Sequence, residues 1–191
     1  MGKEFELKYA ATPEILEAVR KDLGAVTKIA METTYYDTAD KDLSARQMTL
    51  RRRFENGISV CTLKAPAGKN SRKEWETEAA SIQTAVPELC KLSGWQELEI
   101  FSAKGLVAYC GARFTRLAST VTLPDCVVEI ALDSGVLMAG SREVPLCELE
   151  VELKSGSEAA ATAFANMLAS AHGLTREAKS KFARAMALAE R

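Results

Sequence analysis

The chain has 191 residues, of which 47% are hydrophobic and 27% are charged, a length and composition typical of one globular domain with a sizeable core. Its 25 Lys and Arg residues nearly balance its 26 Asp and Glu residues, which argues against a nucleic-acid-binding protein that works through overall positive charge. No apolar run approaches the ~20 residues that a membrane-spanning helix needs, and the first residues are too polar for a signal peptide, so we expect a cytoplasmic protein.

The first half of the chain is predicted to form strands and one helix. Residues 3–9 alternate between charged and apolar side chains, the pattern of a strand with one polar face. Thr12 as N-cap and Pro13 at the next position predict a helix that ends at Gly24. Four further strands are expected at residues 26–37, 47–54, 58–65 and 71–80, with a hairpin turn at Glu55-Asn56-Gly57.

The second half is predicted to continue the sheet and to end in two helices. We expect a short helix at 84–93 and a weak helical turn at 103–110. Strands follow at 112–122, 126–132, 136–140 and 146–154, with turns at Pro124-Asp125 and Asp133-Ser134-Gly135. Ser157 begins an alanine-rich helix that runs to residue 171, and residues 175–190 form the last one. The sequence therefore predicts a single α+β domain over residues 1–191, rich in antiparallel strands.

The cysteine and histidine content excludes several kinds of site. The five cysteines are widely spaced without a Cys-x-x-Cys pair, so neither a disulfide framework nor a zinc site is predicted. His172 is the only histidine, which argues against a Ser-His-Asp triad. The sequence also has no glycine-rich loop of the phosphate- or dinucleotide-binding kinds. Any chemistry must therefore rest on carboxylates, lysines and arginines, together with an added metal.

Charged side chains recur with a period of two on the predicted strands. The sets, mostly separated by apolar residues, are Glu4/Glu6/Lys8, Arg51/Arg53, Thr62/Lys64, Arg72/Glu74/Glu76/Glu78 and Glu148/Glu150/Glu152. An antiparallel sheet with one solvated face gives a similar pattern, but most of these faces are almost purely acidic or purely basic. If the strands curl so that the charged faces look inward, carboxylates suited to Mg²⁺ or Mn²⁺ lie opposite cations suited to phosphate oxygens.

Eight motifs occur in an order that resembles a known family. They are Glu4-Phe5-Glu6-Leu7-Lys8, Tyr35-Tyr36-Asp37-Thr38, Thr49-Leu50-Arg51-Arg52-Arg53, Thr62-Leu63-Lys64, Arg72-Lys73-Glu74-Trp75-Glu76, the segment from Val128 to Gly135, the segment from Glu148 to Gly156, and Ser180-Lys181-Phe182-Ala183-Arg184. Together they resemble the CYTH superfamily, the triphosphate tunnel metalloenzymes, over essentially the whole chain. The fifth and seventh motifs are most similar to the bacterial inorganic triphosphatase branch.

The resemblance implies a closed eight-stranded antiparallel β-barrel, flanked by helices, through which a triphosphate is threaded together with Mg²⁺ or Mn²⁺. Its implied metal ligands are Glu4, Glu6, Asp133, Glu148 and Glu150. Its implied substrate-binding cations are Lys8, Arg51, Arg53, Lys64, Arg72, Arg113, Arg116 and Lys181. Its implied catalytic residues are Glu4, Glu6, Lys8, Arg51, Arg53, Lys64, Glu74 and Glu76.

Four further positions complete these expectations. Arg184 is expected on the surface of the last helix. Arg113 is an alternative to Arg116, because either arginine of this strand could face inward. Glu152 is implied as a weaker carboxylate at the mouth of the tunnel. Arg52 is expected to face outward, because it lies between two inward-facing arginines.

The activity implied by the resemblance is the metal-dependent hydrolysis of inorganic tripolyphosphate to pyrophosphate and phosphate. Its partner would be a small-molecule triphosphate, with no nucleic acid and no membrane; the oligomeric state stays open. A class IV adenylyl cyclase or a thiamine triphosphatase would use the same fold. A non-catalytic polyphosphate-binding module is a further alternative, against which the metal-binding carboxylates argue. Nucleic-acid binding through Arg51-Arg52-Arg53 finds little support in the net charge of −1 or the 6% aromatic content.

Overall fold

The computed structural model describes residues 5–68 and 71–190, so the predictions for Glu4 lie outside the described residues. Nine strands form one antiparallel sheet in the order β5-β4-β3-β2-β6-β7-β8-β1-β9. The strands are β1 (Glu6–Ala10), β2 (Thr27–Thr38), β3 (Thr49–Glu55), β4 (Ile58–Gly68), β5 (Ser71–Glu78), β6 (Leu106–Thr122), β7 (Cys126–Ala139), β8 (Arg142–Gly156) and β9 (Thr175–Arg176).

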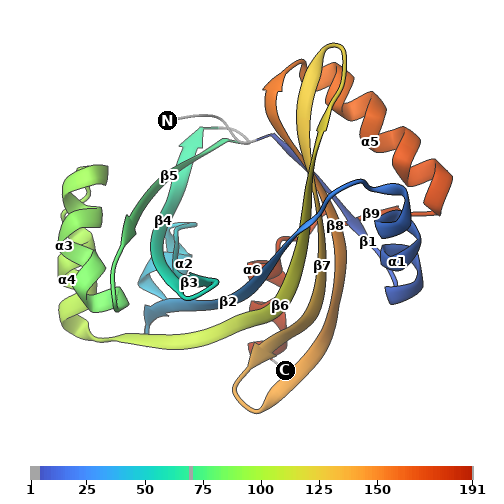
Figure 1. The fold of residues 1–191 in the computed structure, drawn as a ribbon. Coiled ribbons are helices and arrows are strands. Elements are labelled where there is room, and N and C mark those ends of the chain that lie inside the picture. Colours follow the sequence, from blue (N-terminus) through green and yellow to red (C-terminus); the bar gives the residue numbers. More distant parts are fainter. Residues whose placement is uncertain (1–4, 69–70, 191) are drawn as a thin grey trace.

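The sheet is strongly curled but is not closed. Its pairing ends at β5 on one side and at β9 on the other, and β9 takes part of the second edge of β1 through Tyr9 and Ala10. The prediction of a closed eight-stranded barrel is therefore wrong: over the described residues there are nine strands with two free edges. The long strands β6, β7 and β8, of 17, 14 and 15 residues, accumulate the right-handed twist that curls a sheet. The curl brings the β3–β5 end and the β8–β1 end to opposite sides of one concave face (Figure 1).

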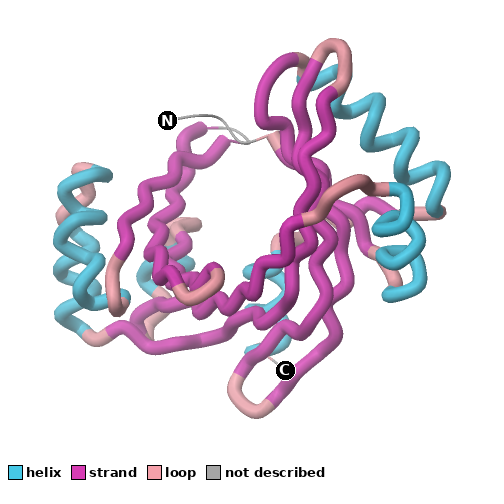
Figure 2. Tube along the Cα trace, viewed as in Figure 1, coloured by secondary structure: helices cyan, strands magenta, loops and turns pink. Residues whose placement is uncertain are grey.

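Five of the six helices in the described part of the chain are α1 (Pro13–Asp22), α3 (Ile82–Ser93), α4 (Glu97–Lys104), α5 (Glu158–His172) and α6 (Lys181–Ala189). Figure 2 shows α1 and α5 outside one end of the sheet and α3 and α4 outside the other. Side-chain oxygens of Thr12, Ser81, Ser157 and Ser180 accept hydrogen bonds from the first turns of α1, α3, α5 and α6, as expected of N-caps. None of the helices formed by the described residues is long and apolar enough to cross a membrane.

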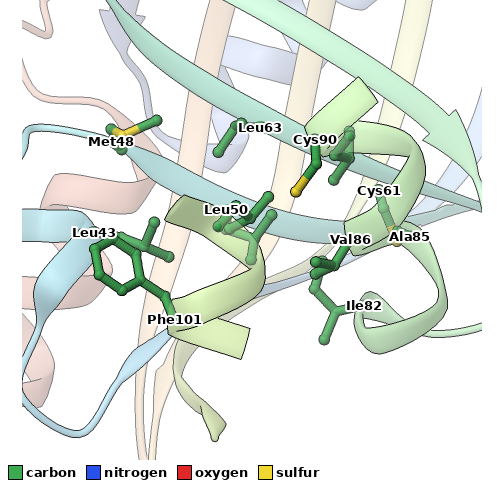
Figure 3. Close-up of a cluster of buried hydrophobic side chains, with 12 residues drawn as sticks. Leu43, Met48, Leu50, Cys61, Leu63, Ile82, Ala85, Val86, Cys90 and Phe101 are labelled. Carbon is green, nitrogen blue, oxygen red and sulfur yellow. The ribbon is translucent and has the colours of Figure 1, made fainter. Parts of the chain in front are cut away.

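The hydrophobic core is divided between the two faces of the sheet. On the convex face, Leu50 of β3 and Leu63 of β4 pack with Ile82 and Val86 of α3 (Figure 3). A second outer cluster joins β1, β7 and β8 to α1 and α5. A third cluster lies on the concave face, where α6 packs against β2, β6, β7 and β8. Because apolar residues cover the convex side of β3 and β4, the alternate charged residues of these strands face the concave interior.

The predicted motif Tyr35-Tyr36-Asp37-Thr38 has a structural role at its aspartate. The buried Asp37 carboxylate accepts hydrogen bonds from the backbone N–H groups of Thr38, Leu43 and Ser44 and from the Ser44 hydroxyl, at 2.7–2.9 Å. These bonds hold the sixth helix, α2 (Asp42–Ala45), against the end of β2. This one-turn helix was not predicted from the sequence.

Three predicted boundaries in the second half of the chain are wrong. The helix near residue 103 is α4, which ends at Lys104, and residues 106–110 already belong to β6. Residues 133–135 are not a turn, because β7 runs through them. The last helix starts at Lys181 rather than at residue 175, because residues 175 and 176 pair with β1 instead.

Gly135 explains why residues 133–135 resembled a turn in the sequence. A Cβ atom at Gly135 would lie 2.2 Å from the carbonyl oxygen of Arg113 and 2.5 Å from the Cα atom of Phe114. Glycine is therefore required by the close approach of β6 to β7 rather than by a change in chain direction.

Candidate functional site

A cavity of about 650 Å³ lies on the concave face of the curled sheet. Charged side chains from β3, β4 and β5 line one side, and charged side chains from β1, β7 and β8 line the other. Tyr35 of β2, Phe114 of β6 and Phe182 of α6 also line it, and the rings of Tyr35 and Phe182 lie 4.9 Å apart. Helix α6 therefore contributes to the cavity as well as to the core beneath it.

The basic wall of the cavity consists of Arg51 and Arg53 of β3, Lys64 of β4 and Arg72 of β5. Arg51 lies next to Tyr35 of β2 and Thr62 of β4 in the sheet. Burial, reinforced by the neighbouring Arg51, lowers the pKa of the Arg53 guanidinium. The Nε atoms of Arg51 and Arg53 are buried and have no hydrogen-bond partner among the described residues. Each arginine therefore keeps one unsatisfied donor in this wall.

Carboxylates on β5 partly neutralise this basic wall. Glu74 contacts Arg51 Nη2 at 3.2 Å through Oε1 and Lys64 Nζ at 2.8 Å through Oε2. Glu76 accepts a hydrogen bond from the Thr62 hydroxyl at 2.9 Å, and although burial opposes it, this bond and the nearby Arg51 lower the pKa of Glu76. The wall therefore combines fixed cations with carboxylates that hold them in place.

An acidic row crosses three neighbouring strands on the opposite side. Glu6 of β1 pairs in register with Glu152 of β8, which pairs in register with Glu129 of β7. Lys8 lies 3.1 Å from Glu6, and Lys154 lies 2.9 Å from Glu152 and 3.5 Å from Glu129. The three carboxylates are 27–32% exposed. Like charges directly opposite each other destabilise a sheet, so a row of three is unfavourable unless cations compensate it.

The acidic row has the ligand type that a divalent cation requires. It offers several carboxylate oxygens, the ligands that Mg²⁺ and Mn²⁺ prefer. Its members are open to the cavity, and only two lysines face three carboxylates among the contacts of the described residues.

A second group of carboxylates, Asp133 of β7 with Glu148 and Glu150 of β8, lies deeper. Their oxygens lie within 4.8 Å of one another, and Asp133 and Glu148 are fully buried. Arg116 of β6 and Lys181 and Arg184 of α6 contact them directly. Burial, reinforced by Glu150, raises the pKa of Glu148 to about 6. Although burial opposes it, Lys181 and Arg116 hold the pKa of Glu150 below its usual range.

The structure brings most of the predicted site residues to this one cavity. Those that line it are Glu6, Lys8, Arg51, Arg53, Lys64, Arg72, Glu74, Glu76, Arg116, Glu150 and Lys181. Asp133 and Glu148 lie beneath the cavity, and both contact Lys181, which lines it. Arg52 faces the convex side, with its guanidinium 4.3 Å from the centroid of the Phe54 ring.

Arg113 lies away from the cavity. Its side chain is 60% exposed and contacts Glu143 at 3.3 Å, while Arg116 enters the cavity. The two positions differ by three, so on a continuous strand their side chains point to opposite faces.

Three residues of the site were missed by sequence reasoning. Glu129 and Lys154 lie within motifs already recognised, and their period-two spacing from Asp133 and Glu152 could have placed them on the inner face. Arg184 was expected on the surface of the last helix. It contacts the buried Glu148 instead, which only the position of α6 on the concave face explains.

Residues 2–186 match the family model of the CYTH domain. The chain is 31% identical over 166 residues to an inorganic triphosphatase of Haemophilus influenzae, a match that covers 82% of this chain and 47% of that protein. The chain thus spans about half the length of this curated relative.

Two solved structures share the fold over nearly their whole length. One is a Hippeastrum protein described as a putative adenylyl cyclase with a dominant triphosphatase activity, with a TM-score of 0.69 and 19% identity over 95% of this chain and 94% of that chain. The other is a protein of Pyrococcus horikoshii, with a TM-score of 0.63 and 24% identity over 98% of this chain and 99% of that chain. At these identities the likeness concerns the fold alone.

Proposed function

The chain belongs to the CYTH domain family, and from this premise we propose that it hydrolyses inorganic tripolyphosphate to pyrophosphate and phosphate with the help of Mg²⁺ or Mn²⁺. The observation that carries the proposal is the pairing of two unlike walls around one cavity. A basic wall alone suits anion capture, whereas hydrolysis of a phosphoanhydride also needs charge neutralisation, which the facing acidic row can provide through a cation. The 31% identity to an inorganic triphosphatase supports the choice of substrate.

The basic wall binds the phosphate chain in this proposal. Arg51, Arg53 and Lys64 line the cavity and donate charge-assisted hydrogen bonds to non-bridging phosphate oxygens. Glu74 holds Arg51 and Lys64 in place before the substrate enters. The phosphates of the substrate then take over these contacts. These contacts stabilise negative charge that shifts between phosphoryl oxygens during the reaction.

The acidic row holds the divalent cation, with Glu6, Glu129 and Glu152 as ligands in this proposal. When bound, the cation supplies Lewis-acid polarisation of phosphoryl oxygens. Lys8 and Lys154 contact the row and limit the repulsion among its carboxylates. Tyr35 and Phe182 close the apolar side of the cavity and restrict the water that reaches the substrate there.

A rate comparison tests the proposal. Purified protein is given tripolyphosphate, ATP or thiamine triphosphate with Mg²⁺ or Mn²⁺, and phosphate release is measured with and without excess EDTA. We expect tripolyphosphate to be the fastest substrate and EDTA to abolish its turnover. Faster turnover of ATP or thiamine triphosphate would replace the proposed substrate. Undiminished turnover in EDTA would overturn the role of the metal, and the absence of any turnover with either metal would overturn the proposed activity.

A further inference from the structure

Six charged side chains form a cluster beneath the cavity, and one of them, Arg184, also contacts Glu177 at 3.7 Å. The carboxylates are Asp133, Glu148 and Glu150, and the cations are Arg116, Lys181 and Arg184. The three positive and three negative charges are equal in number. Four elements, β6, β7, β8 and α6, contribute to the cluster.

Asp133 is at the centre of this cluster. Its carboxylate accepts two hydrogen bonds from one guanidinium, from Arg116 Nε at 2.8 Å and from Arg116 Nη2 at 2.7 Å. The same carboxylate lies 2.8 Å from Lys181 Nζ. Asp133 is fully buried, whereas Arg116 and Lys181 line the cavity. The aspartate therefore lies behind two cations that face the ligand space.

The geometry of the contacts fixes the direction of both cations. The paired hydrogen bonds to Asp133 hold the plane of the Arg116 guanidinium, because a planar fork binds a carboxylate in one orientation. An ammonium group has three donors, and Lys181 Nζ contacts three carboxylates. It lies 2.8 Å from Asp133 and 2.8 Å from Glu150, and it also contacts Glu148.

The cluster differs from the acidic row in how it is compensated. Each carboxylate of the cluster contacts two cations, whereas each carboxylate of the row contacts one. A metal ion in the cluster would have to displace buried Lys or Arg side chains, and unpaired buried charges are strongly unfavourable. The acidic row has two lysines for three partly exposed carboxylates and is open to the cavity. A divalent cation at the cluster would therefore compete with buried cations for carboxylates that lie within 4.8 Å of one another, whereas at the row it would compete with fewer cations.

We propose that Asp133 is a positioning residue, which holds Arg116 in the orientation that a terminal phosphate of the substrate requires, and that it is not a metal ligand. This inference rests on the proposed function, because it assigns Arg116 to the triphosphate. It also gives Asp133 a role different from the one implied by the family resemblance.

Two measurements on Asp133→Asn test the inference. Binding of tripolyphosphate is measured by calorimetry in excess EDTA, where no metal contributes, and the rate of hydrolysis is measured across a Mg²⁺ series. We expect metal-free binding to weaken by roughly 10-fold or more, the loss that follows when a charge-assisted hydrogen bond is displaced. We also expect added Mg²⁺ to leave the lost rate unrestored. Unchanged metal-free binding, or recovery of the rate at high Mg²⁺, would overturn the positioning role.

Glu152→Gln is the matched variant from the acidic row. It removes a negative charge from the cavity, so metal-free tripolyphosphate should bind at least as tightly as it does to wild type. The Mg²⁺ concentration needed for half-maximal rate should rise. If the two variants responded to Mg²⁺ in the same way, the distinction between the row and the cluster would be wrong.

Arg116→Lys provides a second test in case Asp133→Asn does not fold. It keeps the charge but loses the planar fork, so the inference expects weakened metal-free binding here too, with melting curves to confirm the folded state. Tight metal-free binding by Arg116→Lys would contradict the inference even if Asp133→Asn did not fold. Absence of tripolyphosphate binding and turnover in the wild-type protein would overturn the proposed function and this inference with it. If the wild-type protein were active and added Mg²⁺ restored the rate of Asp133→Asn, only this inference would be overturned and the proposed function would stand.

Discussion

Substitution of Arg53 by alanine tests the basic wall at a position with a neighbouring control. Arg53 lines the cavity with 22% of its side chain exposed, contacts Glu55, and keeps a buried Nε without a partner among the described residues. Losing one charge-assisted hydrogen bond to a phosphoryl oxygen costs about 1.5–3 kcal/mol, which corresponds to roughly a 10- to 150-fold fall in kcat/KM. Phosphate release from tripolyphosphate at saturating Mg²⁺ measures this fall, and no added metal should restore the rate.

The effect on stability should be small. Glu55 is 34% exposed, and a partly exposed ion pair contributes about 0.2–1 kcal/mol. For a chain of this size, that corresponds to a fall in Tm of about 4 °C or less. A melting curve therefore separates loss of substrate binding from loss of folded protein.

Arg52→Ala is the control, one residue away on the same strand. Its guanidinium lies over the Phe54 ring on the convex face, and an exposed cation–π contact contributes only about 0.5–1 kcal/mol. We expect activity close to that of wild type. If Arg52→Ala lost as much activity as Arg53→Ala, or if Arg53→Ala retained full activity, the assignment of phosphate binding to the inner face of β3 would be refuted.

Two further predictions concern packing. Gly135→Ala should lower the Tm strongly or prevent folding, because its Cβ would lie 2.2 Å from the Arg113 carbonyl oxygen and 2.5 Å from the Phe114 Cα atom; a melting curve with an undisturbed Tm would show that β6 and β7 can separate. A thiol reagent at pH 8 should modify at most one cysteine of the native protein and all five after denaturation, because only Cys147 is not buried and burial raises the pKa of Cys110 to about 12. Rapid modification of two or more native thiols would contradict the burial.

The sequence was sufficient to identify the strands that carry the site and the direction of most of their side chains. Arg51 and Arg53 were expected to face inward and Arg52 outward, and the structure confirms this phase. The prediction succeeded because the side chains of a strand alternate between its two faces, so apolar neighbours on one face determine the other. The family resemblance rested on eight motifs and their order in the sequence. The family model matches residues 2–186.

The sequence did not determine how charges on distant strands combine. The family resemblance implied Asp133, Glu148 and Glu150 as metal ligands, and the structure brings their oxygens within 4.8 Å of one another. Local spacing contained no information about which cations lie opposite them. Arg184 shows the same limit, since it contacts Glu148 from a helix 36 positions further along the chain. Such pairings depend on where α6 packs on the sheet.

Closure of the sheet was likewise decided by the tertiary structure. Each strand reveals its own alternation, yet whether the first and last strands meet depends on the accumulated twist of the sheet and on competition for free edges. Here the two-residue strand β9 pairs with β1, and the pairing ends at β5 on the other side. The sequence by itself thus determined which faces are charged, because alternation is a local property of the backbone. The tertiary structure alone decided which charges neutralise each other and which remain open to a ligand, because those contacts join residues far apart in the chain.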